Sequence, residues 1–177
     1  MNLQKGDAPF IMTAALPPDM ASWATALRRE YFPPERNFLD AHVTLFHALP
    51  PSCEDELCDL LAELVKRHSA PAGRLEGLMS LGRGTALRLS SQELLNIRRD
   101  IADHFHGSLS PQDSHHPRLH VTIQNKVSPA EAKALQARLD DQIAPRAIAF
   151  PALELHIYRG GPWEFVKRWP FRGNTAA

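Results

Sequence analysis

The tetrapeptide His-Val-Thr-Leu at residues 42–45 recurs as His-Val-Thr-Ile at residues 120–123. Each copy lies in an apolar run that predicts a β-strand, and each precedes a stretch with the start signals of a helix. An internal repeat of this kind indicates a duplicated structural unit. The sequence therefore predicts two related lobes, each contributing one copy of the motif.

Around the motifs, helix and strand patterns follow one another irregularly. Start signals and helical spacing predict helices after residues 17–19, from Ser52, from a capping box at Ser90 and from a second box at 128–131. Runs typical of strands occupy residues 10–16, 41–49, 74–81, 85–89, 119–127, 147–158 and 164–169. Without a regular βαβ order or a glycine-rich nucleotide loop, the pattern favours an α+β fold with antiparallel sheets.

Composition excludes several classes of protein. At 177 residues the chain has the length of one domain, and we expect a single domain over residues 1–177. Its 20 Lys and Arg balance its 20 Asp and Glu, so we do not expect it to wrap duplex DNA. No apolar run is long enough for a membrane span and the N-terminus lacks a signal-peptide pattern, so we expect a cytoplasmic location. We also expect a monomer. Cys53 and Cys58 predict neither a disulfide nor a metal site. Residues 173–177 are expected to form a disordered tail.

The repeated strands place a histidine and a threonine on one face. With strict alternation, the shared faces comprise His42, Thr44 and Phe46 in the first copy, and His120, Thr122, Gln124 and Lys126 in the second. Two imidazoles on opposite sides of a phosphorus atom can activate an attacking hydroxyl and protonate the leaving oxygen. Threonine hydroxyls can donate hydrogen bonds to the phosphate oxygens. Such a site needs no metal.

These two motifs resemble those of the two-histidine (2H) phosphoesterases, in the branch of 2′-5′ RNA ligase-like proteins and cyclic phosphodiesterases. The Gly-Gly-Pro-Trp segment at 160–163 is also similar. The resemblance implies a bilobal, pseudo-symmetric fold in which two antiparallel sheets form a central groove, with helices packed outside. It further implies His42 and His120 as the acid/base pair and Thr44 and Thr122 as phosphate ligands, without a cofactor. Which histidine acts as the base stays open.

Other residues are candidates for substrate contact. Arg118 precedes the second motif and is expected to point with its catalytic face, where it would contact a phosphate. Gln124 and Lys126 could line the groove, although a solvated strand end is the favoured interpretation of Lys126. Phe46 is either core or a platform for a base, and Tyr158 could frame a base beside the 160–163 segment. A metal site at His104, His106, His115 and His116 matches no known ligand spacing.

The leading functional hypothesis is metal-independent hydrolysis of a 2′,3′-cyclic phosphate at an RNA terminus or on a small nucleotide. The alternatives are a 2′-5′ RNA ligase or 2′-5′ oligonucleotide phosphodiesterase, and a non-catalytic module that binds nucleotides or RNA. The first two would share the same pair of histidines, whereas the third would use the groove for recognition only.

Overall fold

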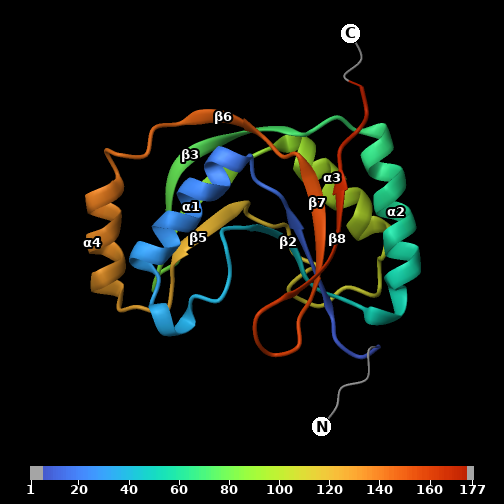
Figure 1. The fold of residues 1–177 in the computed structure, drawn as a ribbon, viewed down its shortest axis with the longest axis horizontal. Helices are drawn as coiled ribbons and strands as arrows, with labels where there is room; N and C mark the ends of the chain where they lie inside the picture. Colours follow the sequence, from blue (N-terminus) through green and yellow to red (C-terminus); the bar gives the residue numbers. More distant parts are fainter. Residues whose placement is uncertain (1–5, 175–177) are drawn as a thin grey trace.

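Two four-stranded antiparallel sheets form the framework of the protein, as the α+β prediction required (Figure 1). The computed structural model describes residues 6–174. The first sheet has the order β2-β1-β7-β8 and the second has the order β5-β4-β3-β6. Their bounds are β1 Phe10–Ala14, β2 Val43–Leu49, β3 Ala72–Ser80, β4 Thr85–Ser90, β5 His120–Gln124, β6 Arg146–Ala149, β7 Ala152–Ile157 and β8 Glu164–Pro170.

Four α-helices of the described part cover the outer faces of these sheets: α1 Pro18–Tyr31, α2 Glu54–Arg67, α3 Gln92–His104 and α4 Pro129–Leu139. In Figure 1, α1 and α4 lie on one side of the molecule with the second sheet, and α2 and α3 lie on the other side. Helix α1 follows β1 of the first sheet but packs against β5 of the second. Helix α3 follows β4 and contacts β3 of the same sheet, and its Arg98 also reaches β2 of the first sheet.

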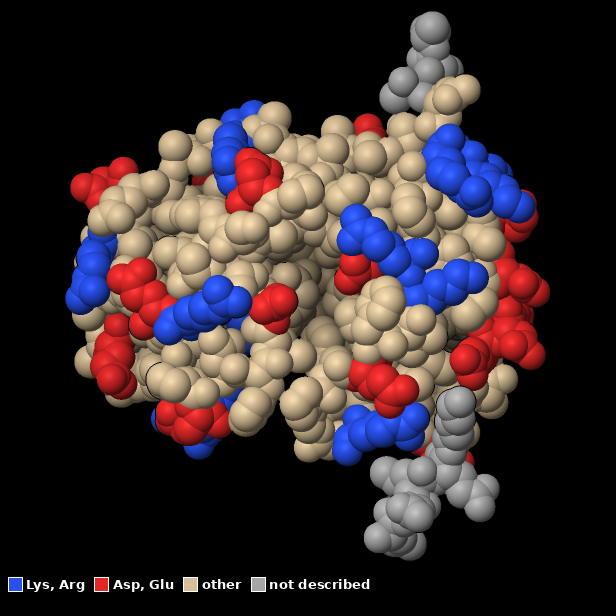
Figure 2. Space-filling model, in the orientation of Figure 1, with Lys and Arg blue, Asp and Glu red and all other residues tan. Residues whose placement is uncertain are grey.

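The two motif strands meet where the lobes join. Both β2 and β5 are edge strands of their sheets, and they contact each other. Figure 2 shows one face of the molecule, which is hollowed between the two lobes and carries basic and acidic side chains interspersed. The fold therefore brings both tetrapeptides to the same junction, although 78 residues separate their histidines along the chain, from His42 to His120.

The strand expected over residues 147–158 is in fact two strands in different sheets. Strand β6 pairs with β3, whereas β7 pairs with β1 and β8. The chain crosses between the sheets at Phe150 and Pro151; Phe150 is fully buried and Pro151 cannot donate a ladder hydrogen bond. The continuous apolar run concealed this crossing because both of its halves are strand-like.

Two helix starts also differ from the predictions. Ser91, rather than Ser90, caps α3 by accepting a hydrogen bond from the amide of Leu94. Glu93 does not close a capping box, because its carboxylate accepts the amide of Ala72 at 2.9 Å. Helix α2 begins at Glu54, after a short 3-10 turn at Pro51–Cys53. The box that Ser128 and Glu131 form at the start of α4 is confirmed.

The C-terminal segment runs past the end of α2. The amide of Arg172 donates to the carbonyl of Val65 and that of Gly173 donates to the carbonyl of His68. Residues 175–177 of the expected tail lie outside the described residues. Between residues 6 and 174, no helix combines the length and apolar character needed to cross a membrane.

Candidate active site

A cavity of about 380 Å³ at the junction of the lobes contains both motif histidines. His42 and Thr44 reach it from the first sheet, and His120 and Thr122 reach it from the second. The four residues with the expected chemistry are therefore brought to one cavity, which we call the central cavity. Trp163 closes one side, with its ring centroid 4.6 Å from that of His42.

The two imidazoles are held in the same way. Nδ1 of His42 lies 2.8 Å from the carbonyl oxygen of Asp40, and Nδ1 of His120 lies 2.6 Å from that of Arg118. A carbonyl oxygen can only accept, so in both residues Nδ1 carries the proton and donates it. This leaves Nε2 of each ring available for proton transfer in the cavity. The backbone two residues before each histidine thus fixes its tautomer.

His42 is held in its neutral form at neutral pH. Desolvation by burial lowers the pKa of His42 from 6.5 to about 4. The hydrogen bond to Asp40 opposes this lowering of the pKa, whereas coulombic interactions with Arg28, His156 and His120 add to it. A neutral imidazole with a free Nε2 can accept a proton.

Both motif strands contain an irregularity one residue after the threonine. Thr13 pairs with Thr44 while its neighbour Met12 pairs with Phe46, so the first motif strand carries one extra residue there. The second motif strand repeats this pattern: Ala86 of β4 pairs with Thr122, whereas its neighbour Thr85 pairs with Gln124. An extra residue of this kind reverses the alternation beyond it.

Phe46 and Gln124 consequently do not line the cavity, contrary to the alternation. Phe46 is fully buried and packs beneath the guanidinium of Arg98, whose Cζ lies 4.2 Å from the ring centroid. Gln124 is also buried, and its Oε1 accepts a hydrogen bond from the hydroxyl of Thr85 at 3.2 Å. Strict alternation placed both of them wrongly, and the core interpretation of Phe46 holds.

The remaining candidates divide between the cavity and the surface. Arg118 lines the central cavity, as expected for a phosphate contact. Lys126 is exposed in the turn after β5, where its φ is +60°, and it does not line the cavity. Tyr158 is 44% exposed and also lies outside the cavity lining, which Trp163 reaches instead.

His47 and Asp113 form a part of the site that the sequence did not reveal. Because the alternation reverses after Leu45, His47 faces the central cavity. Buried Asp113 accepts the amides of His47 and Ala48 and lies 3.2 Å from Nδ1 of His47. Burial raises the pKa of Asp113, but the hydrogen bonds from His47 and Ala48 outweigh it and lower the pKa below 3.8.

The histidines considered for a metal site are scattered. His115 and His116 line the central cavity, whereas His104 is paired with Glu56 at 2.8 Å, away from it. Within residues 6–174, no group of three or more His, Cys, Asp or Glu side chains has the arrangement of a metal site.

Two buried arginines connect the motifs across the lobes. Arg28 of α1 donates to the carbonyls of Leu39 and Thr122, at 3.0 and 2.7 Å. Arg98 of α3 donates to the carbonyls of Leu45 and Asp113. Both arginines are nearly inaccessible to solvent, and in each helix the other buried residues are apolar. A buried arginine in an apolar helix stripe was the available signal for their structural role.

Comparison with solved structures shows the same fold. The protein TT0787 of Thermus thermophilus has a TM-score of 0.65 at 13% sequence identity, over 94% of this chain and 100% of that one. Escherichia coli LigT complexed with NADP+ has a TM-score of 0.61 at 18% identity, over 93% and 98% of the two chains. A structure described as a phosphoesterase has a TM-score of 0.59 at 20% identity, with the same coverage.

At the level of sequence, a comparison with curated proteins finds no match. The model of the 2′-5′ RNA ligase superfamily, however, matches residues 16–162, a span that includes both motifs and most of the Gly-Gly-Pro-Trp segment. This span is most of the chain. The chain therefore belongs to the 2′-5′ RNA ligase superfamily of 2H phosphoesterases.

Proposed function

We propose that this protein hydrolyses a 2′,3′-cyclic phosphate, carried by an RNA terminus or a small nucleotide, without a metal. The observation that carries the proposal is the matched pair of imidazoles in the central cavity, each with Nδ1–H donated to a backbone carbonyl and Nε2 free. Such a pair can take a proton at one side of a phosphorus atom and give one at the other.

We assign His42 as the general base. Its lowered pKa keeps its ring neutral at physiological pH, so Nε2 accepts a proton from water as the water oxygen attacks phosphorus. His120, which must carry a proton on Nε2 as well as on Nδ1 for this step, then serves as the general acid and gives its Nε2 proton to the ribose oxygen as the P–O bond breaks. The hydroxyls of Thr44 and Thr122 donate to the non-bridging oxygens, whose charge increases in the transition state.

A ligase reaction is the second candidate, because cavities adjoin the central one on both lobes. One of about 420 Å³ on the first sheet shares His42 and Trp163 with it, and one of about 800 Å³ on the second shares Pro117 and Arg118. Two flanking cavities provide space for two RNA ends, with a 5′-hydroxyl replacing the attacking water. E. coli LigT, which has this fold, has been crystallised with 3′-AMP and with ATP.

The test is an assay on the four nucleoside 2′,3′-cyclic phosphates, with products identified by phosphorus NMR. His42→Ala and His120→Ala should each reduce kcat by about 10²–10⁴-fold, the usual contribution of a general acid or base. His106→Ala is the matched control, because that histidine is exposed and lies outside the cavity. Undiminished turnover in both motif variants contradicts the mechanism.

Two further arms of the assay separate the alternatives. Activity should persist in EDTA, since the proposed residues supply every proton transfer. In the second arm, an RNA with a 5′-hydroxyl terminus is added, and the appearance of a joined product would favour the ligase. Nucleotide binding without turnover of any substrate would favour a recognition module.

A further inference from the structure

The cavity on the second sheet, which we call the basic pocket, has a volume of about 800 Å³ and opens beside the central cavity. Its walls come from β3, β4, the start of α3 and the segment 117–119 that leads into the second motif. Pro117 and Arg118 line both cavities, so the two adjoin at this segment. A volume of this size accommodates a nucleotide unit.

The basic pocket lies on the same face of the sheet as His120. Arg88 of β4 is the direct antiparallel partner of His120, and directly opposed residues project to one face. Ser90, two residues along β4, shares this face, and Arg74 of β3 is the direct partner of Ser90. A row of side chains therefore leads from the motif histidine to Arg74.

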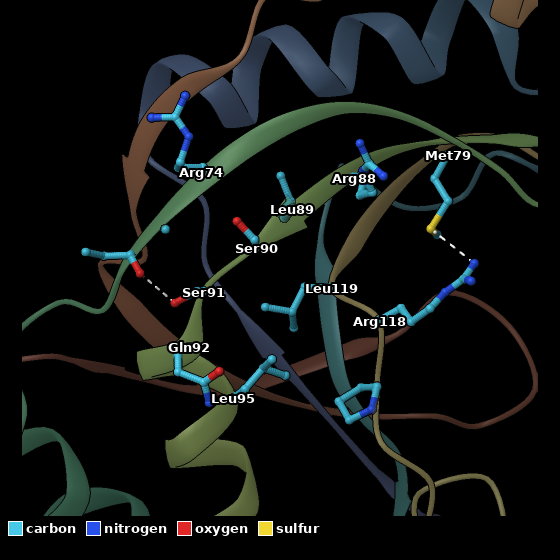
Figure 3. Close-up of a pocket in the computed structure, with 13 residues that line it drawn as sticks. Arg74, Met79, Arg88, Leu89, Ser90, Ser91, Gln92, Leu95, Arg118 and Leu119 are labelled. Carbon is cyan, nitrogen blue, oxygen red and sulfur yellow. Dashed lines mark hydrogen bonds between the residues drawn. The ribbon is translucent and has the colours of Figure 1, made fainter.

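Three guanidinium groups surround the hollow, and two have no counter-charge. In Figure 3, Arg74, Arg88 and Arg118 lie around Leu89, Ser90 and Leu119. Within the described part of the chain, the Arg88 side chain has no hydrogen bond or ion pair, and that of Arg118 reaches only the sulfur of Met79, at 3.3 Å. Thioether sulfur is a weak acceptor, so both groups keep their donors available for an anion.

Arg74 is only partly compensated. Its Nε lies 3.9 Å from Oε1 of Glu76, an oxygen that also accepts the hydroxyl of Ser90 at 2.6 Å. Among the described residues that line the pocket, three are arginines and none is acidic; Glu76 and Glu93 adjoin it through Ser90 and Ala72. Met79 and Leu95, both half-buried, add apolar surface for a ribose or a base.

The cavity on the first sheet has a different character. Its arginine, Arg168, is paired with Glu154 at 2.6 Å, and its walls include the aromatic rings of Phe38, Trp163 and Phe165. Aromatic rings suit a base, whereas unpaired guanidinium groups suit a phosphodiester. The two arms of the groove are therefore chemically unequal.

We propose that the basic pocket binds the nucleotide adjoining the reacting phosphate, with Arg88, Arg74 and Arg118 holding its phosphodiester. Hydrolysis of an RNA end would then be preferred over that of a mononucleotide, which has only the reacting phosphate. The proposal rests on the proposed function for the location of that phosphate. The pocket itself is independent of the chemistry, because its free guanidinium groups bind a phosphodiester with or without turnover.

The test compares a nucleoside 2′,3′-cyclic phosphate with a trinucleotide that ends in the same nucleoside and the same cyclic phosphate. The wild type should give the trinucleotide the higher kcat/KM, and Arg88→Gln should reduce this preference by about tenfold, the loss expected from one charge-assisted contact. Arg99→Gln, an exposed arginine outside every cavity described, removes the same charge and should leave the preference unchanged.

Salt dependence provides a second readout. For a single strand, each phosphate contact contributes about 0.7 to the slope of log affinity against log salt concentration, so Arg88→Gln should lower the slope for the trinucleotide by about that amount. A merely structural effect would lower affinity without changing the slope. Equal kcat/KM for the two substrates, or the same loss in Arg99→Gln, overturns the pocket while leaving the proposed function intact.

If the wild type hydrolyses neither substrate, the proposed function fails, and a binding measurement then tests the proposal for the basic pocket. A trinucleotide ending in a 3′-phosphate, titrated against wild type, Arg88→Gln and Arg99→Gln, should then lose affinity only in Arg88→Gln. Equal affinity in all three proteins overturns the proposal.

Discussion

Arg28, on the helix that precedes the first motif, donates a 2.7 Å hydrogen bond to the carbonyl of Thr122 in the second motif. Arg98 reverses the relationship, because it precedes the second motif and donates to Leu45 in the first. Each helix thus holds the strand of the motif that it does not precede. A displacement of either helix would move a threonine or histidine relative to a bound phosphate.

Replacing Arg28 by Met should lower both stability and activity. It leaves the carbonyls of Leu39 and Thr122 without their donor, which should cost about 1–3 kcal/mol in the free energy of unfolding. Loss of the Arg28 charge should also raise the pKa of His42. Urea denaturation and an NMR titration of the His42 ring measure the two effects. Arg29→Met, at an exposed neighbouring position, should show neither, and equal effects in both variants would refute the assignment.

His42 should make the protein less stable in mild acid. With a pKa of about 4 when folded and about 6.5 when unfolded, the unfolded chain binds the additional proton between these values. The free energy of unfolding should therefore fall as pH is lowered from about 6.5 to about 4. His42→Gln should show a smaller fall over the same interval in urea denaturation. A His42 ring that titrates near 6.5 by NMR contradicts this prediction.

Asp113→Asn should weaken the loop that precedes the second motif. While buried, the carboxylate accepts the amides of His47 and Ala48 at Oδ2, and its Oδ1 lies within hydrogen-bond distance of the amide and Nδ1 of His47. The NH2 group of an asparagine cannot accept at the second of these positions, so a loss of about 1–3 kcal/mol is expected. Because the pKa of folded Asp113 lies below 3.8, its contribution is present above that pH and is lost on further acidification.

The variant should therefore be less stable than the wild type at neutral pH, with a difference that narrows below pH 3.8. Denaturation at a series of pH values measures it. Asp100→Asn, at an exposed position of α3, serves as the control and should match the wild type throughout. A constant difference across the series would show that the carboxylate's charge is not involved.

Gly84→Ala should destabilise the packing of the turn between β3 and β4 against the end of β5. A Cβ at this position would overlap the carbonyl oxygen of Gln124 and lie 2.7 Å from Cα of Asn125, and neither backbone atom can move aside cheaply. We expect a loss of about 1–3 kcal/mol in thermal or urea denaturation. Gly161→Ala, where a Cβ meets nothing within 4 Å, should change stability by about 0.5 kcal/mol or less. Similar losses in both variants would exclude the overlap as the cause.

The sequence was informative where the pattern was local and repeated. The two tetrapeptides, the helix stripes and the Ser128 capping box sufficed for the α+β class, and the motif histidines do reach one cavity. The orientation of the side chains just beyond the motifs was harder to predict, because strict alternation assumes that the two paired strands have no extra residue. The extra residue after each threonine reverses the faces, turning Phe46 and Gln124 inward and His47 outward.

Long-range features were hidden for a different reason. Nothing in the apolar run of residues 147–158 distinguishes its β6 half from its β7 half, since their partners are set by strands far away. The role of Asp113 likewise depends on a strand more than 60 residues earlier, at His47. Arg28 and Arg98 lie within helices, but only the packing of those helices on the opposite lobes shows which carbonyls they hold.

The crossing at Phe150 and Pro151 has a consequence for how the chain folds during its synthesis. Strand β7 lies between β1 and β8 in the first sheet, so β1 has only one of its two neighbours until residues 152–157 have emerged from the ribosome. Helix α1 must likewise await β5, against which it packs. Contacts so distant in sequence form slowly, and they deny the growing N-terminal half an independent fold. We therefore expect the first sheet to close late, after both motif strands have been synthesised.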